Sequence, residues 1–315
     1  MKINTDRIWI ITDLHFGVRS NSLEWLEIQK DYFENWFMPI LKKKKKDNDI
    51  LFVLGDIFDN RQSINTLVQN TVIDIFENLG KILPVYIILG NHDTFRKSTN
   101  DINSLKILNY LENVQVFEEP EFLEFDTTTG LLMPWRKNAY TEKECLEKHG
   151  DCNYIFSHTG ISGFYFNRYI KMDDEFLDNN VLSNFDRVIT GHIHYAQLRG
   201  NVIMPGCPYE LTRSDSDNEK GIYIFKPKEN DFEFIENNYT PKFLKIQLED
   251  ILDTPFGEFQ KMIQNNYVDI IVNLKWSVDF PFNLLLDSLS GYRKVNVIVN
   301  PNDEDIQLDE DENAD

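Results

Sequence analysis

The chain has 315 residues, of which 42% are hydrophobic, so it is long enough for one large globular domain and a smaller one. Its formal net charge of −20 argues against a protein that coats nucleic acid through a basic surface. No apolar run approaches the roughly 20 residues of a membrane-spanning helix, so no membrane partner is expected. Three cysteines without zinc-like spacing, and an N-terminal segment without a signal-peptide core, predict a reduced, cytoplasmic location.

The first part of the chain alternates strands with helices. Periodicity predicts strands at 8–12, 50–54 and 84–89 and helices at 22–38, 63–79 and 101–112. Pro39 is expected to kink or end the first helix, and Gly80 to cap the second. This order favours a mostly parallel sheet with helices on its faces, which is an α/β class.

Strands predominate further along. We expect added β-structure at 114–135 and strands at 153–157, 187–191, 201–204, 221–226 and 232–238. Composition changes near Pro241, after which the pattern predicts a strand at 243–248, a helix at 256–265, a strand at 267–275, a helix at 281–290 and a strand at 292–299. The predicted domains are therefore 1–240, a small α+β cap domain at 241–300, and an acidic tail at 301–315 whose composition favours disorder.

Five predicted strands end in side chains that bind metal ions. These segments are Asp13-Leu14-His15, Gly55-Asp56-Ile57-Phe58-Asp59, Gly90-Asn91-His92-Asp93, His158 and Gly191-His192-Ile193-His194. Only one of the six histidines, His149, lies elsewhere. In α/β folds the carboxyl ends of the strands are where sites are built. Carboxylate, amide and imidazole donors without cysteine suit manganese, magnesium, iron or zinc. Seven candidate ligands fit two ions better than one, and Asp56, on a central strand, is the natural bridging ligand.

The ordered set of motifs resembles the calcineurin-like metallophosphoesterases over about residues 6–240. Within that family, the segments 13–17, 55–59 and 204–210 are most similar to the SbcD-type DNA repair nucleases, and more closely to the recombination endonuclease subunits of T-even-like bacteriophages. The resemblance implies the four-layer α+β sandwich of the family, with the cap domain in a DNA-binding role. For a phage-encoded chain, the location would be the host cell cytoplasm.

The resemblance implies a role for each matching residue. The two ion sites would be formed by Asp13, His15 and His194, by Asn91, His158 and His192, and by Asp56 between them. His92 would face the scissile phosphate and help protonate the leaving oxygen, and Asp59 would hydrogen-bond His92 and orient it. Some relatives carry a second histidine at the position of Asp59, so the details of proton donation stay open. Asp93 is expected to cap the following turn rather than bind metal.

The implied activity is that of a manganese-dependent DNA nuclease, with magnesium as the second choice of ion. The implied partners are DNA, an SbcC-type SMC-like ATPase and a second copy of the chain. The sequence contains no P-loop pattern, so ATP would have to be bound by another chain. Helices 22–38 and 63–79 are a candidate dimer face, although both could equally be buried against the sheet. Arg168 and Lys171 are among the cations that could contact phosphate, although most surface cations are only solvated.

Two other functions use the same residues. A phosphatase or nucleotide phosphodiesterase would have the same metal site and a small substrate. A non-catalytic scaffold for the ATPase belongs to a different class, and lost ligands would favour it, but none of the predicted ligands is missing. Turnover of a simple phosphodiester separates an enzyme from a scaffold, and activity on long DNA separates a nuclease from a small-molecule phosphatase.

Overall fold

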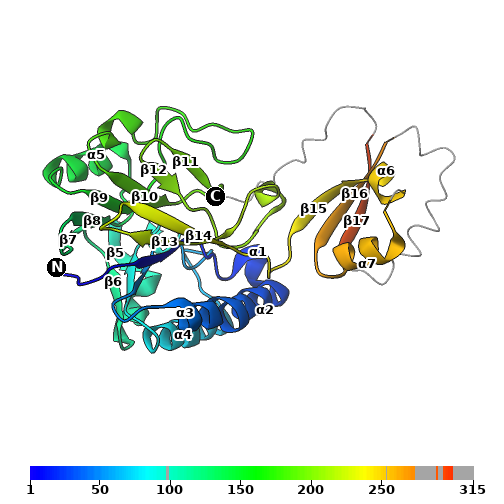
Figure 1. Ribbon diagram of the computed structural model, residues 1–315, viewed down its shortest axis with the longest axis horizontal. Coiled ribbons are helices and arrows are strands. Elements are labelled where there is room, and N and C mark those ends of the chain that lie inside the picture. The colour runs from blue at the N-terminus through cyan, green and yellow to red at the C-terminus, as the bar shows by residue number, and fades with distance from the viewer. Residues whose placement is uncertain (97–98, 253, 274–288, 290–293, 301–315) are drawn as a thin grey trace. The chain divides into compact units, whose positions relative to one another are not determined.

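The computed structural model describes residues 1–96, 99–252, 254–273, 289 and 294–300 (Figure 1). The chain folds as two compact units. The first contains Met1–Leu211 and Asn218–Thr240, and the second contains Thr212–Asp217 and the chain from Pro241 onward. Within the described residues, none of the helices has the length and apolar content that a membrane span needs.

The first unit is built on two six-stranded sheets. One has the order β14 (Asp231–Glu236), β13 (Gly221–Lys226), β1 (Ile8–Ile11), β2 (Ile50–Val53), β3 (Val85–Ile88) and β6 (Val114–Phe117). The other has the order β11 (Gln197–Arg199), β12 (Val202–Met204), β10 (Arg187–Gly191), β9 (Tyr154–His158), β8 (Thr129–Met133) and β7 (Glu121–Glu124). In the first sheet, β1, β2, β3 and β6 are parallel, and β13 and β14 add antiparallel pairs at one edge. In the second sheet, β8, β9, β10 and β12 are parallel, and antiparallel β7 and β11 form the two edges. The expected mostly parallel arrangement is confirmed for the centre of each sheet.

Side chains from both sheets form one core between them. Ile10 and Phe52 of the first sheet pack in the same cluster as Phe156 and Ile189 of the second. Another cluster joins the outer face of the second sheet to Leu146 of α5 (Ala139–Lys148). Because both faces of the central strands are covered, β1 and β2 are continuous runs of buried residues rather than alternating ones. Helices outside two packed sheets give the α+β sandwich that the family resemblance implies.

The first long helix passes through Pro39 instead of ending there. It runs as α2 (Leu23–Asp31), a π-helical segment η1 (Tyr32–Phe37) and α3 (Met38–Lys44). A proline in a helix lacks an N–H donor, and its ring crowds the carbonyl four residues back. In the widened π turn, the N–H of Met38 reaches the carbonyl of Phe33, five residues back. The chain thus accommodates Pro39 by widening the preceding turn, which sequence periodicity does not reveal.

The second long helix, α4 (Thr66–Gly80), starts three residues later than predicted and includes Gly80 as its last residue. In Figure 1, α2, α3 and α4 lie together along one side of the first unit. A left-handed turn, α1 (Val18–Asn21), precedes them, with positive φ angles at Arg19, Ser20 and Asn21. Asn65 caps α4 by accepting the N–H of Leu67 at 2.8 Å, which fixes the starting point.

The predicted helix at 101–112 is wrong. Its first residues belong to β5 (Thr99–Asn103), which pairs with β4 (Thr94–Arg96), and the rest forms the 3₁₀ segment η2 (Ser104–Tyr110). The Asn103 side chain accepts the N–H of Leu105 at 3.1 Å and so starts a tight turn at that position. Two further 3₁₀ turns, η3 (Asn179–Leu182) and η4 (Arg213–Asp215), also occur.

The second unit contains a three-stranded parallel sheet in the order β15, β16 and β17. Its elements are β15 (Phe243–Gln247), α6 (Leu248–Leu252), α7 (Phe256–Gln264), β16 (Tyr267–Asn273) and β17 (Val295–Asn300). Phe259 and Ile263 of α7 pack on Val268 and Ile270 of β16. The predicted helix at 281–290 and the acidic tail at 301–315 lie outside the described residues, apart from residue 289.

Candidate metal centre

The carboxyl ends of five strands bring all seven predicted ligands together. Asp13 and His15 follow β1, Asp56 follows β2, Asn91 follows β3, His158 ends β9, and His192 and His194 follow β10. Three overlapping groups have ligand atoms within 4.8 Å of one another: Asp13, His15 and His194; His15, Asp56 and His92; and Asp56, His158 and His192. Residues up to 181 positions apart in the sequence thus form one cluster.

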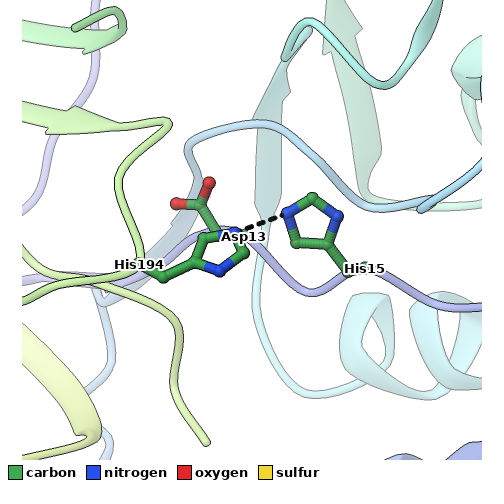
Figure 2. Close-up of side chains that lie close together, drawn as sticks. All are labelled: Asp13, His15 and His194. Atoms are coloured by element: carbon green, nitrogen blue, oxygen red, sulfur yellow. Dashed lines mark hydrogen bonds between the residues drawn. The ribbon is translucent and has the colours of Figure 1, made fainter. Parts of the chain in front are cut away.

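The first group consists of Asp13, His15 and His194. Figure 2 shows the two imidazole rings facing each other beside the Asp13 carboxylate, and their Nε2 atoms are 2.9 Å apart. Both carboxylate oxygens of Asp13 accept the N–H of His192, at 3.0 and 3.2 Å. This contact ties the first group to the loop that carries the second.

The second group is centred on the amide oxygen of Asn91. Its Oδ1 lies 3.1 Å from Nε2 of His158 and 2.8 Å from Nδ1 of His192. Asp56 lies between the two groups, because its Oδ2 is 3.3 Å from Nε2 of His158 and 3.7 Å from Nε2 of His15. One carboxylate oxygen therefore faces both sets of imidazoles, which is the arrangement a bridging ligand needs.

Several of these residues have a backbone conformation that L-residues rarely adopt. The φ angle is +54° at Asp13, +46° at His15, +53° at Asp56 and +86° at His192. Such conformations persist only where the surroundings impose them. Gly90 shows how closely the loops approach, since a Cβ atom there would collide with the carboxylate of Asp56. The motif glycine is required by this contact and not only by a turn.

Asp93 holds the central loop in place. Its carboxylate accepts the N–H groups of Asp56 at 2.8 Å, Ile57 at 3.0 Å, Phe58 at 3.2 Å and Gly90 at 2.9 Å. It is a capping residue, as predicted, but the turn that it caps belongs to the neighbouring strand rather than to the segment that follows it. Four main-chain donors from two loops thus fix Asp56 relative to Gly90.

Two buried side chains that the sequence did not single out as functional hold the loop of His15. Nε2 of Gln29, on α2, donates to the carbonyl of Leu14 at 2.7 Å and to that of His15 at 3.2 Å. The hydroxyl of Tyr209 donates to the same Leu14 carbonyl at 2.7 Å. Gln29 could have been identified from its position in the apolar stripe of a predicted helix, because a buried polar side chain needs a hydrogen-bond partner.

His92 and Asp59 interact differently from the expectation. Nδ1 of His92 lies 2.6 Å from the main-chain carbonyl oxygen of Asp59, while the Asp59 carboxylate lies 3.3 Å from Nδ1 of His15. The main-chain N–H of His92 donates to Oδ1 of Asp56 at 2.8 Å. The Asp59 side chain therefore lies beside a residue of the first group, and only its backbone contacts His92. A motif gives the residue type but not which of its atoms makes the contact.

The cluster is electrostatically coupled. Burial alone would lower the pKa of His15, but Asp59 and Asp56 outweigh it and raise the pKa to about 9. His158 behaves in the same way, with Asp56 as its main partner and a pKa of about 9. Burial lowers the pKa of His192 to about 3 and raises that of Asp13 to about 6. Without cations, protons on His15 and His158 therefore balance the charges of Asp59 and Asp56, and the pKa of each of these carboxyl groups is held below its usual range.

The calcineurin-like phosphoesterase family matches residues 6–196, and the chain belongs to this family. Members bind divalent metal ions, and the seven predicted ligands fit such ions, since they are carboxylate, amide oxygen and imidazole groups. The identity of the metal does not follow from this donor set.

The chain is also similar to individual proteins. The chain is 30% identical to exonuclease subunit 1 of Enterobacteria phage T4 over 239 residues, which are 74% of this chain and 68% of that protein. It is 25% identical to the SbcD subunit of the nuclease SbcCD of Staphylococcus saprophyticus over 299 residues, or 82% of this chain and 72% of that protein. A solved archaeal phosphodiesterase is 16% identical with a TM-score of 0.36, covering 73% of this chain and 99% of its own. The resemblance to SbcD-type and phage nucleases is confirmed by the first two.

Proposed function

We propose that this chain is the nuclease subunit of a DNA recombination and repair complex, and that it hydrolyses phosphodiester bonds in DNA as an exonuclease and an endonuclease. The observation that carries the proposal is the convergence of seven oxygen and imidazole donors, with Asp56 among them, in a phosphoesterase. The similarity to two nuclease subunits supports DNA as the substrate.

The proposed cofactors are two divalent ions, with manganese favoured and magnesium as the alternative. Asp13, His15 and His194 would hold one, Asn91, His158 and His192 the other, and Asp56 both. When bound, such ions polarise a phosphate and lower the pKa of an attacking water. The protein would hold these donors in fixed positions, and the hydrogen bonds of Asp93 to the loops of Asp56 and Gly90 contribute to this.

His92 is the proposed proton donor to the leaving oxygen. Its Nδ1 is occupied by the carbonyl of Asp59, so Nε2 is the ring nitrogen left to act on a substrate. Burial lowers the pKa of His92, and Arg61 and His15 add to this effect while Asp56 opposes it. An anionic phosphodiester bound nearby would raise that pKa again and protonate the ring, so the proton would be available once substrate is present.

The proposed assembly contains a second copy of the chain and an SMC-like ATPase of the SbcC type. Both named relatives are subunits of larger nucleases, which supports partners of this kind. Residues 1–240 would be the nuclease domain and residues 241–300 a cap domain that contacts DNA. The body of the chain is acidic, so much of the basic DNA surface would be supplied by the ATPase.

The test is digestion of linear double-stranded DNA and of a small phosphodiester by the purified chain, first with manganese and then with magnesium. DNA degradation that is lost in His92→Ala supports the nuclease. Turnover of the small ester without DNA cleavage, even after addition of the candidate ATPase, would overturn it in favour of a small-molecule phosphodiesterase. No turnover of either substrate would favour a scaffold.

A further inference from the structure

A short hairpin lies just beyond the metal centre. Residues 165–171 follow β9, the strand that ends at His158. Tyr165 and Lys171 pair as an antiparallel bridge at the base of the hairpin. Gln197 of β11 fixes this base, since its Oε1 accepts the N–H of Tyr165 at 3.0 Å and its Nε2 donates to the Tyr165 carbonyl at 2.6 Å.

The tip of the hairpin is also held in one shape. The N–H of Phe166 donates to the carbonyl of Ile170 at 2.8 Å. Asn167 is 6% exposed, and its side-chain oxygen accepts the N–H groups of Tyr169 and Ile170, each at 2.9 Å. A buried asparagine that ties two main-chain donors makes a tight turn with a defined surface.

This tip presents large apolar side chains to solvent. The exposed fraction is 39% for Phe166, 59% for Tyr169 and 45% for Ile170. The guanidinium of Arg168 lies 4.8 Å from the centre of the Tyr169 ring. A fixed turn that exposes three neighbouring apolar residues is a feature of an interaction surface rather than of a core.

Contacts link the hairpin to the metal centre. A Cβ atom at Gly160 would lie 2.9 Å from Cε1 of Phe176 and 3.3 Å from Cδ2 of His192, so the backbone there is packed between these two rings. The ring of Phe176 lies 5.3 Å from that of Phe166, in an edge-to-face arrangement. The aromatic tip is therefore joined to a residue of the second ligand group through two packed contacts.

Cations lie among the aromatic rings of the hairpin. Residues 165–171 contain Arg168 and Lys171, and the exposed carboxylates of Asp173, Asp174 and Glu175 follow directly, so the net charge of the segment does not identify the occupant. Arg199 of β11 adds a third cation, 4.8 Å from the centre of the Tyr165 ring. Exposed aromatic faces with guanidinium groups beside them suit flat nucleic-acid bases, so the rings of the hairpin point to the occupant.

We propose that the 165–171 hairpin is a stacking platform for unpaired bases of the DNA strand whose phosphodiester lies at the metal centre. The proposal rests on the proposed nuclease function and names the part of the surface that receives the strand. Bases can stack on Tyr169 and Phe166 only where they are not paired, because a duplex covers the faces of its bases. The hairpin therefore favours DNA ends or locally opened DNA over intact duplex.

The experiment measures binding of a fluorescent single-stranded oligonucleotide, by anisotropy, to the full chain in the His92→Ala background. Tyr169→Ala and Phe166→Ala are each expected to raise the dissociation constant about tenfold, since each removes a stacking face. Tyr169→Phe keeps the face and is expected to bind as the parent does. Tyr110→Ala is the matched control, because Tyr110 is 87% exposed and lies outside the hairpin. Melting temperatures verify that every variant is folded.

Each result decides the proposal. Loss of affinity in the two alanine variants, with Tyr169→Phe and Tyr110→Ala unchanged, supports it. Equal affinity of all variants, with wild-type protein cleaving DNA, overturns the platform and leaves the nuclease proposal standing. A wild-type chain that hydrolyses a small phosphodiester but binds no DNA overturns both. A change in sedimentation of Tyr169→Ala with intact DNA binding identifies the hairpin as a contact between copies and also overturns the platform.

Discussion

The two halves of the metal centre are supported in different ways. His158 is part of β9 and pairs with Gly191 of β10, and its Nδ1 lies 2.6 Å from the carbonyl of Leu54. His15 lies in a loop beyond the end of β1, with a positive φ angle, and depends on side chains from α2 and from the segment after β12. The half that contains His158 therefore has one ligand fixed by main-chain pairing, whereas the half that contains His15, the loop half, is held by a few buried side chains. We expect the loop half to be the more easily altered by mutation.

Asp56 is common to both halves, so its loss should have the largest effect. Asp56→Asn removes the shared negative charge and keeps the shape of the side chain. We expect phosphodiesterase activity to fall by about a thousandfold or more, because both ion sites lose their common ligand. Steady-state kinetics with manganese measure this, and isothermal titration of Mn²⁺ provides the binding readout. Retention of full metal affinity in both sites would contradict the bridging role.

The pH dependence of metal binding follows from the two protonated histidines. The pKa values of His15 and His158 are each about 9 without cations, so below that pH a bound cation has to displace protons. Metal affinity should therefore rise with pH up to about 9 and then level off, by up to about tenfold per pH unit for each proton displaced. Mn²⁺ titrations at several pH values, with proton release followed in two buffers, test this. Affinity that is constant between pH 6 and about 9 would contradict it.

Asp93 supports the loop that carries Asp56, and its loss should affect stability more than a surface change does. Asp93→Ala leaves four main-chain N–H groups without their acceptor in a buried region. We expect a loss of about 3 kcal/mol or more in the free energy of unfolding, together with weaker metal binding. Urea denaturation measures the first quantity. Asp101→Ala is a suitable control, because Asp101 is exposed on β5. Equal stability of Asp93→Ala and Asp101→Ala would contradict the capping role of Asp93.

Tyr209→Phe tests the loop half with the smallest change, since it removes a single hydroxyl. The lost bond to the Leu14 carbonyl should cost about 1 kcal/mol of stability and loosen the His15 loop. We expect a several-fold loss of affinity in one Mn²⁺ site while the other is unchanged. An equal loss in both sites would show that the two halves do not differ in the way described.

Much of the centre could be predicted from the sequence because the chemistry is local. Each ligand lies at or shortly after the carboxyl end of a buried strand, and parallel strands bring these ends to one edge. The supporting contacts could not be predicted, because they join distant segments. Gln29 reaches His15 from a helix, Tyr209 reaches Leu14 across 195 positions, and Asp59 uses its backbone where a side-chain contact with His92 was expected.

In the fold, too, the features set by nearby residues could be predicted and those set by distant segments could not. The strands at 8–12 and 50–54 could be predicted because a strand that is buried on both faces is a continuous run of apolar residues, many of them β-branched or aromatic. The prediction of a helix at 101–112 was wrong because the first of these residues pair with β4 as part of β5, in spite of the helical periodicity of the segment. At Pro39 a widened turn keeps the helix continuous, and helical periodicity in the sequence does not reveal such a turn.

The most direct test of the central claim is the number of Mn²⁺ ions bound per chain, measured by titration of the wild-type protein and of Asp56→Asn. We expect two ions for the wild type and weakened binding of both in the variant, because one carboxylate serves both halves of the centre. A wild type that binds a single ion, or a variant that keeps two ions at undiminished affinity, would contradict it.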